Sequence, residues 1–570
     1  MKDRLKQLLA SSLASSGQID QPTAYRLLEK PKQDSHGDLA FPCFEIAKRL
    51  KKNPKDLAIE LASNLTLPAG FDHAQAVGPF VNFHFTREIF IRDTLENILS
   101  EKFSKNAQSE KVVLEYSSPN IAKPFHVGHL RATLIGNVLD KVYRFLGYQV
   151  VSVNHLGDWG TQFGFVWAGC ELWGKPQDPT VEALVELYKR ATTLKDNQEN
   201  NTVSESDQKF PEINTLARKY FVDLEQGEAY AVEFWQWCLA ISLQYFKQTY
   251  ARLGISFDHY TGESFYSDKL DSVKETLNAA KILKESEGAF GVDLGEKLGF
   301  ARVYTADGRS LYLTRDLATA EYRAKEFKFD RSIYVVGAPQ TLHFQQIIEI
   351  LKRLGRSYAE KITHVPFGLV LGVKTRGAGD TIELNELLDE AQSRALKAYH
   401  DQVSKRPDGL DEHVVAWGVG VSALIFGMLS KSRIKDVQFN WDQALQFQGD
   451  TGPYVLYACA RVTGIKEKVT IDIAGAVKAQ FLVDDTAYSL AKLLADFIPT
   501  LRLVTIEHEP AILANYLLDV AHAFSKAYLE LKVLGVDAET AKARLQLFEA
   551  TAKVLTQGLE LMGMVPLQRM

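Results

Sequence analysis

Two histidines flank a glycine in the segment PFHVGH. His126 and His129 follow an apolar run and a polar, proline-containing loop, and a helical pattern begins near Gly128. Glycine lets a ligand lie close to the backbone, a helix N terminus attracts an anion, and an imidazole N–H donates to a phosphate. Two histidines three apart are also compatible with chance or with a buried polar pair. The residues around them therefore decide between a nucleotide site and a structural pair.

The block SSPNIAKPFHVGHLRATLIGN, residues 117–137, resembles the adenylate-forming signature of class I aminoacyl-tRNA synthetases, and in detail that of the arginyl-tRNA synthetase family. Further blocks follow in the family's order: NHLGDWGTQFG (154–164), YLTRDLATAEYR (312–323), YVVGAPQTLHFQQ (334–346) and FQGDTGPYVLYACAR (447–461). The resemblance implies ATP-dependent activation of L-arginine to arginyl-adenylate. It also implies transfer to the 3′-terminal ribose of tRNA(Arg), with release of AMP and pyrophosphate.

The resemblance implies an arginine pocket assembled from three of these blocks. A guanidinium needs planar acceptors, and an ionised carboxylate meets its fork of donors bidentately. The implied ligands are Glu115, Ser117, Asn120, His126, Tyr312, Asp316 and Gln340. Their two carboxylates suit the guanidinium and the α-ammonium of one ligand. Because unpaired buried polar groups can reject a poorer ligand by about 10⁴-fold or more, no editing domain against lysine is expected.

The same resemblance implies which residues handle the phosphates. The implied catalytic residues are His126, His129, Lys123 and Lys374, and the implied ATP-binding residues are His126, Gly128, His129, His343, Lys374 and Arg376. Lys374 and Arg376 lie in LGVKTRGAGDT, residues 371–381, a degenerate form of the family's mobile KMSKS loop, and Lys123 is expected on the opposite side of the phosphates. Magnesium should accompany ATP. No structural metal is expected, because Cys43, Cys170, Cys238 and Cys459 form no CxxC pair and have no histidine at ligand spacing.

A second set of residues has the character of an RNA-binding surface. Tyr454, Tyr457 and Arg461 are spaced to share one helix face, and splayed bases stack on such rings. Aromatic residues at helical spacing are more often core, but the resemblance favours anticodon binding and adds Tyr528 and Met570. It also implies that Phe80 and Asn82 contact the tRNA elbow.

The elements that must hold these residues follow from apolar patterning. From Lys111 onward, short apolar runs alternate with helical patterns: VVLEY, a helix near 130–146, YQVVSVN, SIYVVG and HVPFGLVLG. This alternation predicts an α/β fold with a Rossmann-like, doubly wound parallel sheet. We assign residues 110–435 to this catalytic domain. Material near 165–290 is expected as an insertion, with an irregular polar stretch at 174–214.

Two further domains are expected on either side of the catalytic domain. Residues 1–105 begin with Leu5, Leu9 and Leu13 at helical spacing and end in the strand-like GPFVNFHF, which predicts a small α+β domain that contacts tRNA. Residues 436–570 show successive helical patterns, and no strand is expected after about residue 411. This part is predicted to be an all-helical anticodon-binding domain.

Composition limits the alternatives. The chain has 570 residues, 46% hydrophobic and 24% charged, with a formal net charge of -5. Such values exclude collagen, coiled coils and a wholly disordered chain. The mild negative charge also excludes binding of nucleic acid by a positive charge spread over the whole surface. We expect a cytoplasmic protein without a membrane partner, and the family suggests a monomer. A small-molecule adenylyltransferase would not need the helical third of the chain, and a silent RNA-binding paralogue would not need both histidines, Lys123 and the pocket acids.

Overall fold

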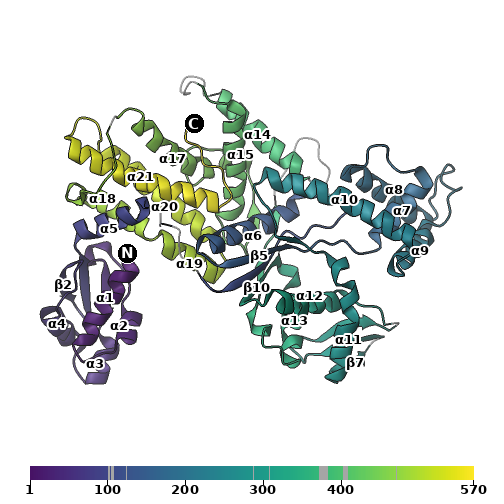
Figure 1. Cartoon of the computed structure of the whole chain (residues 1–570), viewed down its shortest axis with the longest axis horizontal. Helices are drawn as coiled ribbons and strands as arrows, with labels where there is room; N and C mark the ends of the chain where they lie inside the picture. Colours follow the sequence, from purple (N-terminus) through teal and green to yellow (C-terminus); the bar gives the residue numbers. More distant parts are fainter. Residues whose placement is uncertain are drawn as a thin grey trace.

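A five-stranded parallel sheet lies at the centre of the computed structural model (Figure 1). In spatial order its strands are β11 (Ile362–Phe367), β10 (Arg331–Gly337), β4 (Lys111–Glu115), β5 (Gln149–Asn154) and β6 (His259–Tyr260). The chain starts at β4, winds outward through β5 and β6, and returns on the other side of β4 with β10 and β11. The winding reverses between β4 and β10, and ligands of such sheets bind in the crevice at that point. The predicted doubly wound fold is confirmed.

The structure describes residues 1–100, 103, 108–123, 125–286, 288–306, 308–371, 383–401, 409–469 and 471–569. Helix α6 (Val127–Phe145) covers one face of the parallel sheet, and α12 (Tyr312–Phe327) and α13 (Thr341–Arg353) cover the other (Figure 1). Side chains alternate between the two faces of a strand. Val112 and Leu114 join the core on the α6 side, whereas Val113 joins the core beside α12 and α13. Burial on both faces explains the continuous apolar run in β4.

Four helices are inserted between β5 and β6; three of them form the right-hand end of Figure 1, and α10 runs from there toward the centre. They are α7 (Gln162–Trp173), α8 (Val181–Glu199), α9 (Ile213–Glu225) and α10 (Ala229–Arg252). The prediction that residues 174–214 are irregular is wrong, because α8 occupies much of that stretch. Its buried Val181, Leu184, Ala191 and Leu194 recur at helical spacing between the polar residues.

A small antiparallel sheet, order β7-β8-β9, lies between β6 and α12 in the sequence. Its strands are Leu283–Ser286, Ala289–Asp293 and Phe300–Thr305, and the 3₁₀ segment η2 (Glu263–Lys269) and α11 (Leu270–Ala279) precede them. This sheet was not predicted, because β7 is short and largely exposed and therefore carries no apolar pattern.

The N-terminal module has an antiparallel sheet of order β1-β3-β2, formed by Leu39–Pro42, Phe80–Phe85 and Phe71–Val77, with α4 (Pro54–Asn64) packed on β2 and β3 and α1 (Lys2–Ser15) packed on α2 (Gln21–Leu27). Leu5, Leu9 and Leu13 are buried, as their spacing predicts. Helix α3 (Phe44–Leu50) completes the module. In Figure 1 it lies below the C-terminal helices and apart from the parallel sheet. Lys2 pairs with Asp496 at 2.6 Å and Lys492 pairs with Asp38 at 3.4 Å, so the module is joined to those helices by ion pairs.

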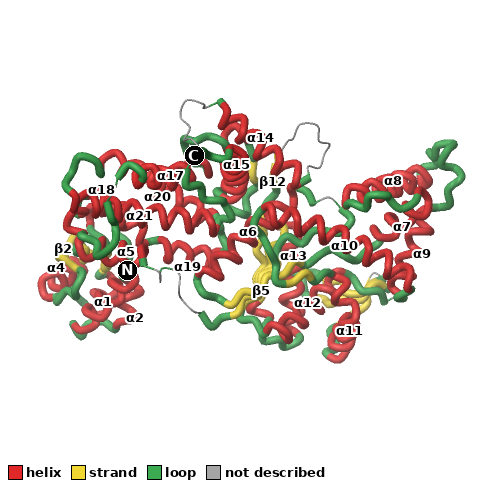
Figure 2. Tube along the Cα trace, turned by 45° about the horizontal axis from the view of Figure 1, so that its top comes forward, coloured by secondary structure: helices red, strands yellow, loops and turns green. Residues whose placement is uncertain are grey.

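Helices dominate the C-terminal part of the chain (Figure 2). They are α14 (Leu384–His400), α15 (Glu412–Leu429), α16 (Trp441–Ala444), α17 (Gly452–Lys466), α18 (Asp485–Ala495), α19 (Phe497–Glu507), α20 (Ala511–Glu530) and α21 (Ala538–Leu561), and α5 (Arg87–Leu99) packs on α18 and α21. The expectation of no strand after residue 411 is wrong, because β13 (Val437–Gln438) pairs in parallel with β12 (Val370–Leu371). A two-residue strand leaves no pattern in a sequence. Helix α15 is long and apolar enough to cross a membrane, but 72% of that span is buried inside the protein, as in a core helix.

The C-terminal end of the α6 helix is tied to the C-terminal helices. Near its C-terminal end, the Tyr143 hydroxyl donates to the carbonyl of Thr505 at 2.9 Å, and Lys141 donates to the carbonyl of Glu560 at 3.3 Å. Thr505 belongs to α19 and Glu560 to α21. The helix that begins at the histidines therefore ends against the C-terminal helices.

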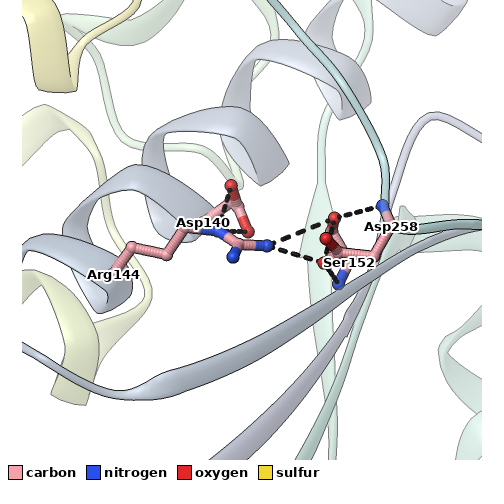
Figure 3. Close-up of polar contacts among 4 residues, drawn as sticks. All are labelled: Asp140, Arg144, Ser152 and Asp258. Carbon is pink, nitrogen blue, oxygen red and sulfur yellow. Dashed lines mark hydrogen bonds and ion pairs between the residues drawn. The ribbon is translucent and has the colours of Figure 1, made fainter.

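A polar network fixes the same end of α6 to the sheet (Figure 3). Arg144 donates to both oxygens of Asp140, at 3.0 and 3.1 Å, and to Asp258 at 2.7 Å. Asp258 also accepts from the backbone and the hydroxyl of Ser152 in β5. Burial raises the pKa of Asp140 to about 6 although Arg144 opposes the shift. The network joins α6, β5 and the segment before β6, and so fixes the helix that carries the histidines to the sheet.

Candidate active site

The polypeptide leaves β4 in a strained loop that we call the histidine loop, residues 116–126. Ser117, Ser118 and Ala122 have φ angles of 74°, 51° and 53°, which L residues other than glycine rarely adopt. Such strain persists only where the surroundings hold it, and it concentrates at functional sites. The loop lies at the switch between β4 and β10, where the fold predicts a ligand.

His126 and His129 close the N terminus of α6. The Gly128 N–H donates to Nδ1 of His126 at 3.0 Å, and the His126 N–H donates to Nδ1 of His129 at 3.3 Å. Since both Nδ1 atoms accept, each neutral ring carries its proton on Nε2. The ring centroids are 4.0 Å apart. Two Nε2–H donors are thus held side by side at a helix N terminus, an arrangement suited to phosphate.

A Cβ at position 128 would lie 2.7 Å from Cε1 of His126, so any residue larger than Gly128 would displace this imidazole. Burial lowers the pKa of His126. Burial, together with the nearby His126 and Lys123, lowers the pKa of His129 to about 3. Both rings are therefore neutral donors near pH 7. Lys123, which is half-buried, supplies a positive charge close enough to affect His129.

Glu115, predicted as an arginine ligand, already faces a guanidinium of the protein. Arg323 from α12 donates from Nη1 to Oε2 of Glu115 at 2.6 Å. Arg323 is fully buried and Glu115 is 6% exposed. The structure thus brings the last residue of β4 and the YLTRDLATAEYR block together inside the core.

Asp316, the second predicted carboxylate, faces His343, which the sequence analysis assigns to ATP. Asp316 Oδ2 lies 2.5 Å from Nε2 of His343, and both side chains are about one-quarter exposed. Tyr312, one turn before Asp316, is 74% exposed. Gln340 at the end of the 3₁₀ turn η3 (Ala338–Gln340) is also exposed.

Asn120 and Ser117 contact the block NHLGDWG and the inserted helices. The Oδ1 atom of Asn120 lies 2.0 Å from where a Cβ on Gly157 would be, so only glycine allows this approach. Ser117 is buried, and its Oγ lies 2.7 Å from both Thr133 Oγ1 and the Tyr250 hydroxyl. The loop is therefore packed against the segment that follows β5 and against α6 and α10.

Glu263 is a carboxylate of the site that the sequence analysis missed. It begins η2, directly after β6, and its Oε2 lies 4.0 Å from Nε of Arg315. Burial raises the pKa of Glu263 to about 7; Arg315 opposes this shift, whereas the charges of Asp158 and Asp316 add to it. A polar residue at the carboxyl end of a parallel strand is the signal that could have identified it.

Three predicted site residues lie outside the described residues: Lys374, Arg376 and Met570. Of the predicted RNA-binding residues, the structure brings Tyr457, Arg461 and Tyr528 together. The Arg461 guanidinium lies 4.5 Å from the Tyr457 ring centroid and 5.0 Å from that of Tyr528. A cavity of about 410 Å³ adjoins Arg461 and Tyr528 and is lined also by Ile465, Val533, Leu534 and Phe548.

Tyr454 is not part of this group, since its hydroxyl bonds to Ser525 at 3.0 Å and its ring contacts His522. In the N-terminal module, Phe80 is half-buried with its edge against Phe44, which is 53% exposed. Asn82 on the same strand is only 3% exposed. Phe80 and Phe44 are thus at the surface of the module, and the structure does not bring Asn82 there.

Family models match the chain in three regions. The model described as tRNA synthetases class I (R), catalytic domain, matches residues 94–441, which is more than half of the chain. The chain belongs to the arginyl-tRNA synthetase family. The arginyl tRNA synthetase N terminal domain matches residues 3–85 and the DALR anticodon binding domain matches residues 455–570. The exact boundaries at 105 and 435 stay predictions.

Relatives of this arginyl-tRNA synthetase family member extend over its whole length. It is 39% identical to an arginine–tRNA ligase of Exiguobacterium sibiricum over 96% of each chain. It is 37% identical to one of Halothermothrix orenii, covering 100% of this chain and 99% of that one. The structure of Thermus thermophilus arginyl-tRNA synthetase is similar with a TM-score of 0.82 and 25% identity, covering 100% of this chain and 99% of that chain.

Proposed function

We propose that this chain condenses L-arginine with ATP to arginyl-adenylate and transfers the arginyl group to the 3′-terminal ribose of tRNA(Arg). The observation that carries the proposal is that the carboxyl end of the parallel sheet holds both acidic side chains, Glu115, Asp316 and Glu263, and the two-histidine terminus of α6. Acids suit a cationic amino acid and the helix terminus suits a nucleotide phosphate. Family membership supports the same reaction.

The chemical step is attack of the arginine carboxylate oxygen on the α-phosphorus of ATP, with pyrophosphate as the leaving group. Preorganised donors stabilise the charge that develops on the phosphoryl oxygens. The Nε2–H groups of His126 and His129 serve this role, and Lys123 adds a cation. Magnesium enters with ATP as part of the substrate. Lys374 and Arg376 are proposed to act from the other side of the phosphates.

The arginine side chain is proposed to lie between Asp316 and Glu263. Glu115, held by Arg323, is proposed to contribute its negative charge to the α-ammonium group. Asn120, Ser117, Tyr312 and Gln340 complete the pocket in this proposal. The pairing of Asp316 with His343 couples the amino-acid side of the site to the nucleotide side.

The RNA is proposed to contact two surfaces. The rings of Tyr457 and Tyr528 with Arg461 offer a stacking platform for anticodon bases. Phe80, with Asn82 behind it, is proposed for the tRNA elbow, and Tyr454 and Met570 for the anticodon side. We propose domains at 1–105, 110–435 and 436–570, and a monomer that works in the cytoplasm.

The test is a charging assay with each of the twenty amino acids and total tRNA. Charging by arginine alone is expected, and charging by another amino acid would overturn the proposal. Asp316→Asn should raise the KM for arginine about tenfold or more, because a charge-assisted contact is lost. The KM for ATP should change less, because the amide oxygen of the introduced side chain can still accept from His343. Asp268→Asn is the matched control, since Asp268 is an exposed acid paired with Lys269.

A further inference from the structure

A chain of hydrogen bonds connects β5 to the first turn of α6 through the inserted helix α10. Asn154 Nδ2 lies 2.9 Å from the Tyr250 hydroxyl, which lies 2.7 Å from Ser117 Oγ. Ser117 Oγ lies 2.7 Å from Thr133 Oγ1, and Thr133 donates to the carbonyl of His129 at 2.7 Å. All of the side chains in this chain are buried.

The donor and the acceptor of every hydrogen bond in this series can be assigned. Each hydroxyl has one proton, and Thr133 uses its proton on His129, so Ser117 must donate to Thr133. Tyr250 must then donate to Ser117. Since the Tyr250 proton is used, its oxygen accepts, and Asn154 must present its amide nitrogen to it. The Tyr250 hydroxyl is thus the only group among the described residues that donates to Ser117 Oγ.

Helix α10 contacts the histidine loop through a stripe of three residues four apart, Ser242, Phe246 and Tyr250. Ser242 Oγ accepts the N–H of Ala122 at 3.1 Å, and the rings of Phe246 and Tyr250 lie 5.4 and 5.3 Å from that of Phe125. Two of the contacts are to Ser117 and Ala122, which have positive φ. The stripe therefore supports two of the strained residues of the loop, Ser117 and Ala122, together with Phe125.

We propose that Tyr250 is a positioning residue for adenylate formation. Its hydroxyl holds Ser117 in the left-handed conformation and, through Ser117 and Thr133, fixes the His129 carbonyl and the first turn of α6. The imidazoles of His126 and His129 then keep the orientation in which their Nε2–H groups face the phosphates. This assigns a role in the chemical step to an inserted helix, and it rests on the proposed activation of arginine.

The test is Tyr250→Phe, measured by arginine-dependent ATP–pyrophosphate exchange with tRNA present and corrected for active sites. Removing the hydroxyl leaves Ser117 without a donor and the Asn154 amide unpaired. The exchange kcat should fall about tenfold or more, with less than about threefold change in the KM for ATP. Tyr260→Phe is the matched control, because Tyr260 belongs to the same aromatic cluster around Phe257 and its hydroxyl makes no hydrogen bond within the described part of the chain.

A purely structural role would lower the melting temperature and leave the exchange rate per active site unchanged, which would overturn the proposal. If Tyr250 acts through Ser117, the double variant Tyr250→Phe with Ser117→Ala should be no slower than Ser117→Ala alone. If the two substitutions instead lower kcat independently, so that their effects multiply in the double variant, the proposal is overturned as well. If Tyr250→Phe does not fold, Thr133→Val breaks the chain at its other end and should reduce kcat similarly. A wild-type chain that shows no arginine-dependent exchange would refute the proposed function instead.

Discussion

Arg323 donates from Nη1 to Oε2 of Glu115 across 2.6 Å, inside the core at the carboxyl end of β4. The protein thus places a guanidinium of its own on a carboxylate that the family resemblance assigns to substrate arginine. The Nε and Nη2 atoms of Arg323 have no hydrogen-bond partner within the described residues. The pair fixes the position of Glu115, so that it can present its negative charge to the site without moving.

Arg323→Gln should strongly destabilise the protein, because it leaves a buried carboxylate unpaired. Breaking a buried ion pair from one side costs about 3–5 kcal/mol. Thermal inactivation followed by residual charging activity measures the loss. The matched control is Arg356→Gln, which removes a partly exposed arginine from its pair with Glu321 and should cost about 1 kcal/mol or less. Equal inactivation temperatures for the two variants would contradict this account.

The ring orientation of His126 predicts that two polar replacements differ. Asn places its amide near the Nδ1 position and can still accept from Gly128, whereas Gln extends a donor toward the Nε2 position. His126→Asn should therefore keep the helix cap and lower adenylate formation by roughly 10² or more. His126→Gln should retain more of the rate. The measurement is the single-turnover rate of adenylate formation, with circular dichroism as the folding control. If His126→Asn were faster than His126→Gln, Nε2 would not be the donor.

His129 allows a second test of the Nε2 donor, at a more buried ring. Its Nδ1 accepts the His126 N–H, so His129→Asn should preserve this bond and lose the Nε2 donor, again by roughly 10² in adenylate formation. Because burial lowers the pKa of His129 to about 3, its loss should not alter the pH dependence between pH 6 and 8. A shifted pH profile in this range would show that the ring titrates there.

Glu263 should give arginine use a pH dependence. Its pKa is raised to about 7, so the carboxyl is neutral below that pH and carries the charge that a guanidinium needs above it. The kcat/KM for arginine should fall as the pH falls below about 7, since this ratio reports the free enzyme. Glu263→Gln should lower the plateau and remove this limb. If the pH profiles of kcat/KM for the variant and the wild type were parallel, the fall in kcat/KM below about pH 7 would come from another group.

Tyr457→Ala should raise the KM for tRNA through loss of a stacking platform worth about 1–3 kcal/mol per base. The arginine KM at saturating tRNA should change little. Tyr454→Phe is the internal comparison: it keeps a ring that is also proposed for the anticodon side and removes only the bond to Ser525, so the KM for tRNA should change little. An unchanged KM for tRNA with a lower melting temperature would show that Tyr457 is a core residue.

The parallel sheet could be predicted because burial on both faces leaves apolar runs such as VVLEY and SIYVVG, which the sequence displays directly. The helix at His126 could be predicted because its first turn and the glycine lie next to each other in the chain. The same local signals are absent from β7, which is exposed, and from β13, which has only two residues. The helix α8 was missed because its apolar positions are diluted by charged and polar residues.

The partners of the site residues could not be predicted. Glu115 and Arg323 are 208 positions apart, and Ser117 and Tyr250 are 133 apart. Which arginine or tyrosine reaches a given acid or hydroxyl depends on how helices pack on the sheet, and neither periodicity nor spacing records that packing. Glu263 was overlooked for a related reason, since the two-residue strand β6 before it gives little sign of ending at the crevice.

Helix α6 has the histidines at one end and α19 and α21 at the other. Its 19 residues make a rod about 28 Å long, so tilting it by about 5° about its far end would swing the first turn by about 2.5 Å. That displacement is nearly the length of a hydrogen bond. A small tilt of α6 imposed from α19 or α21 would therefore displace both imidazoles, so the bonds to Thr505 and Glu560 help to set where the His126 and His129 rings lie.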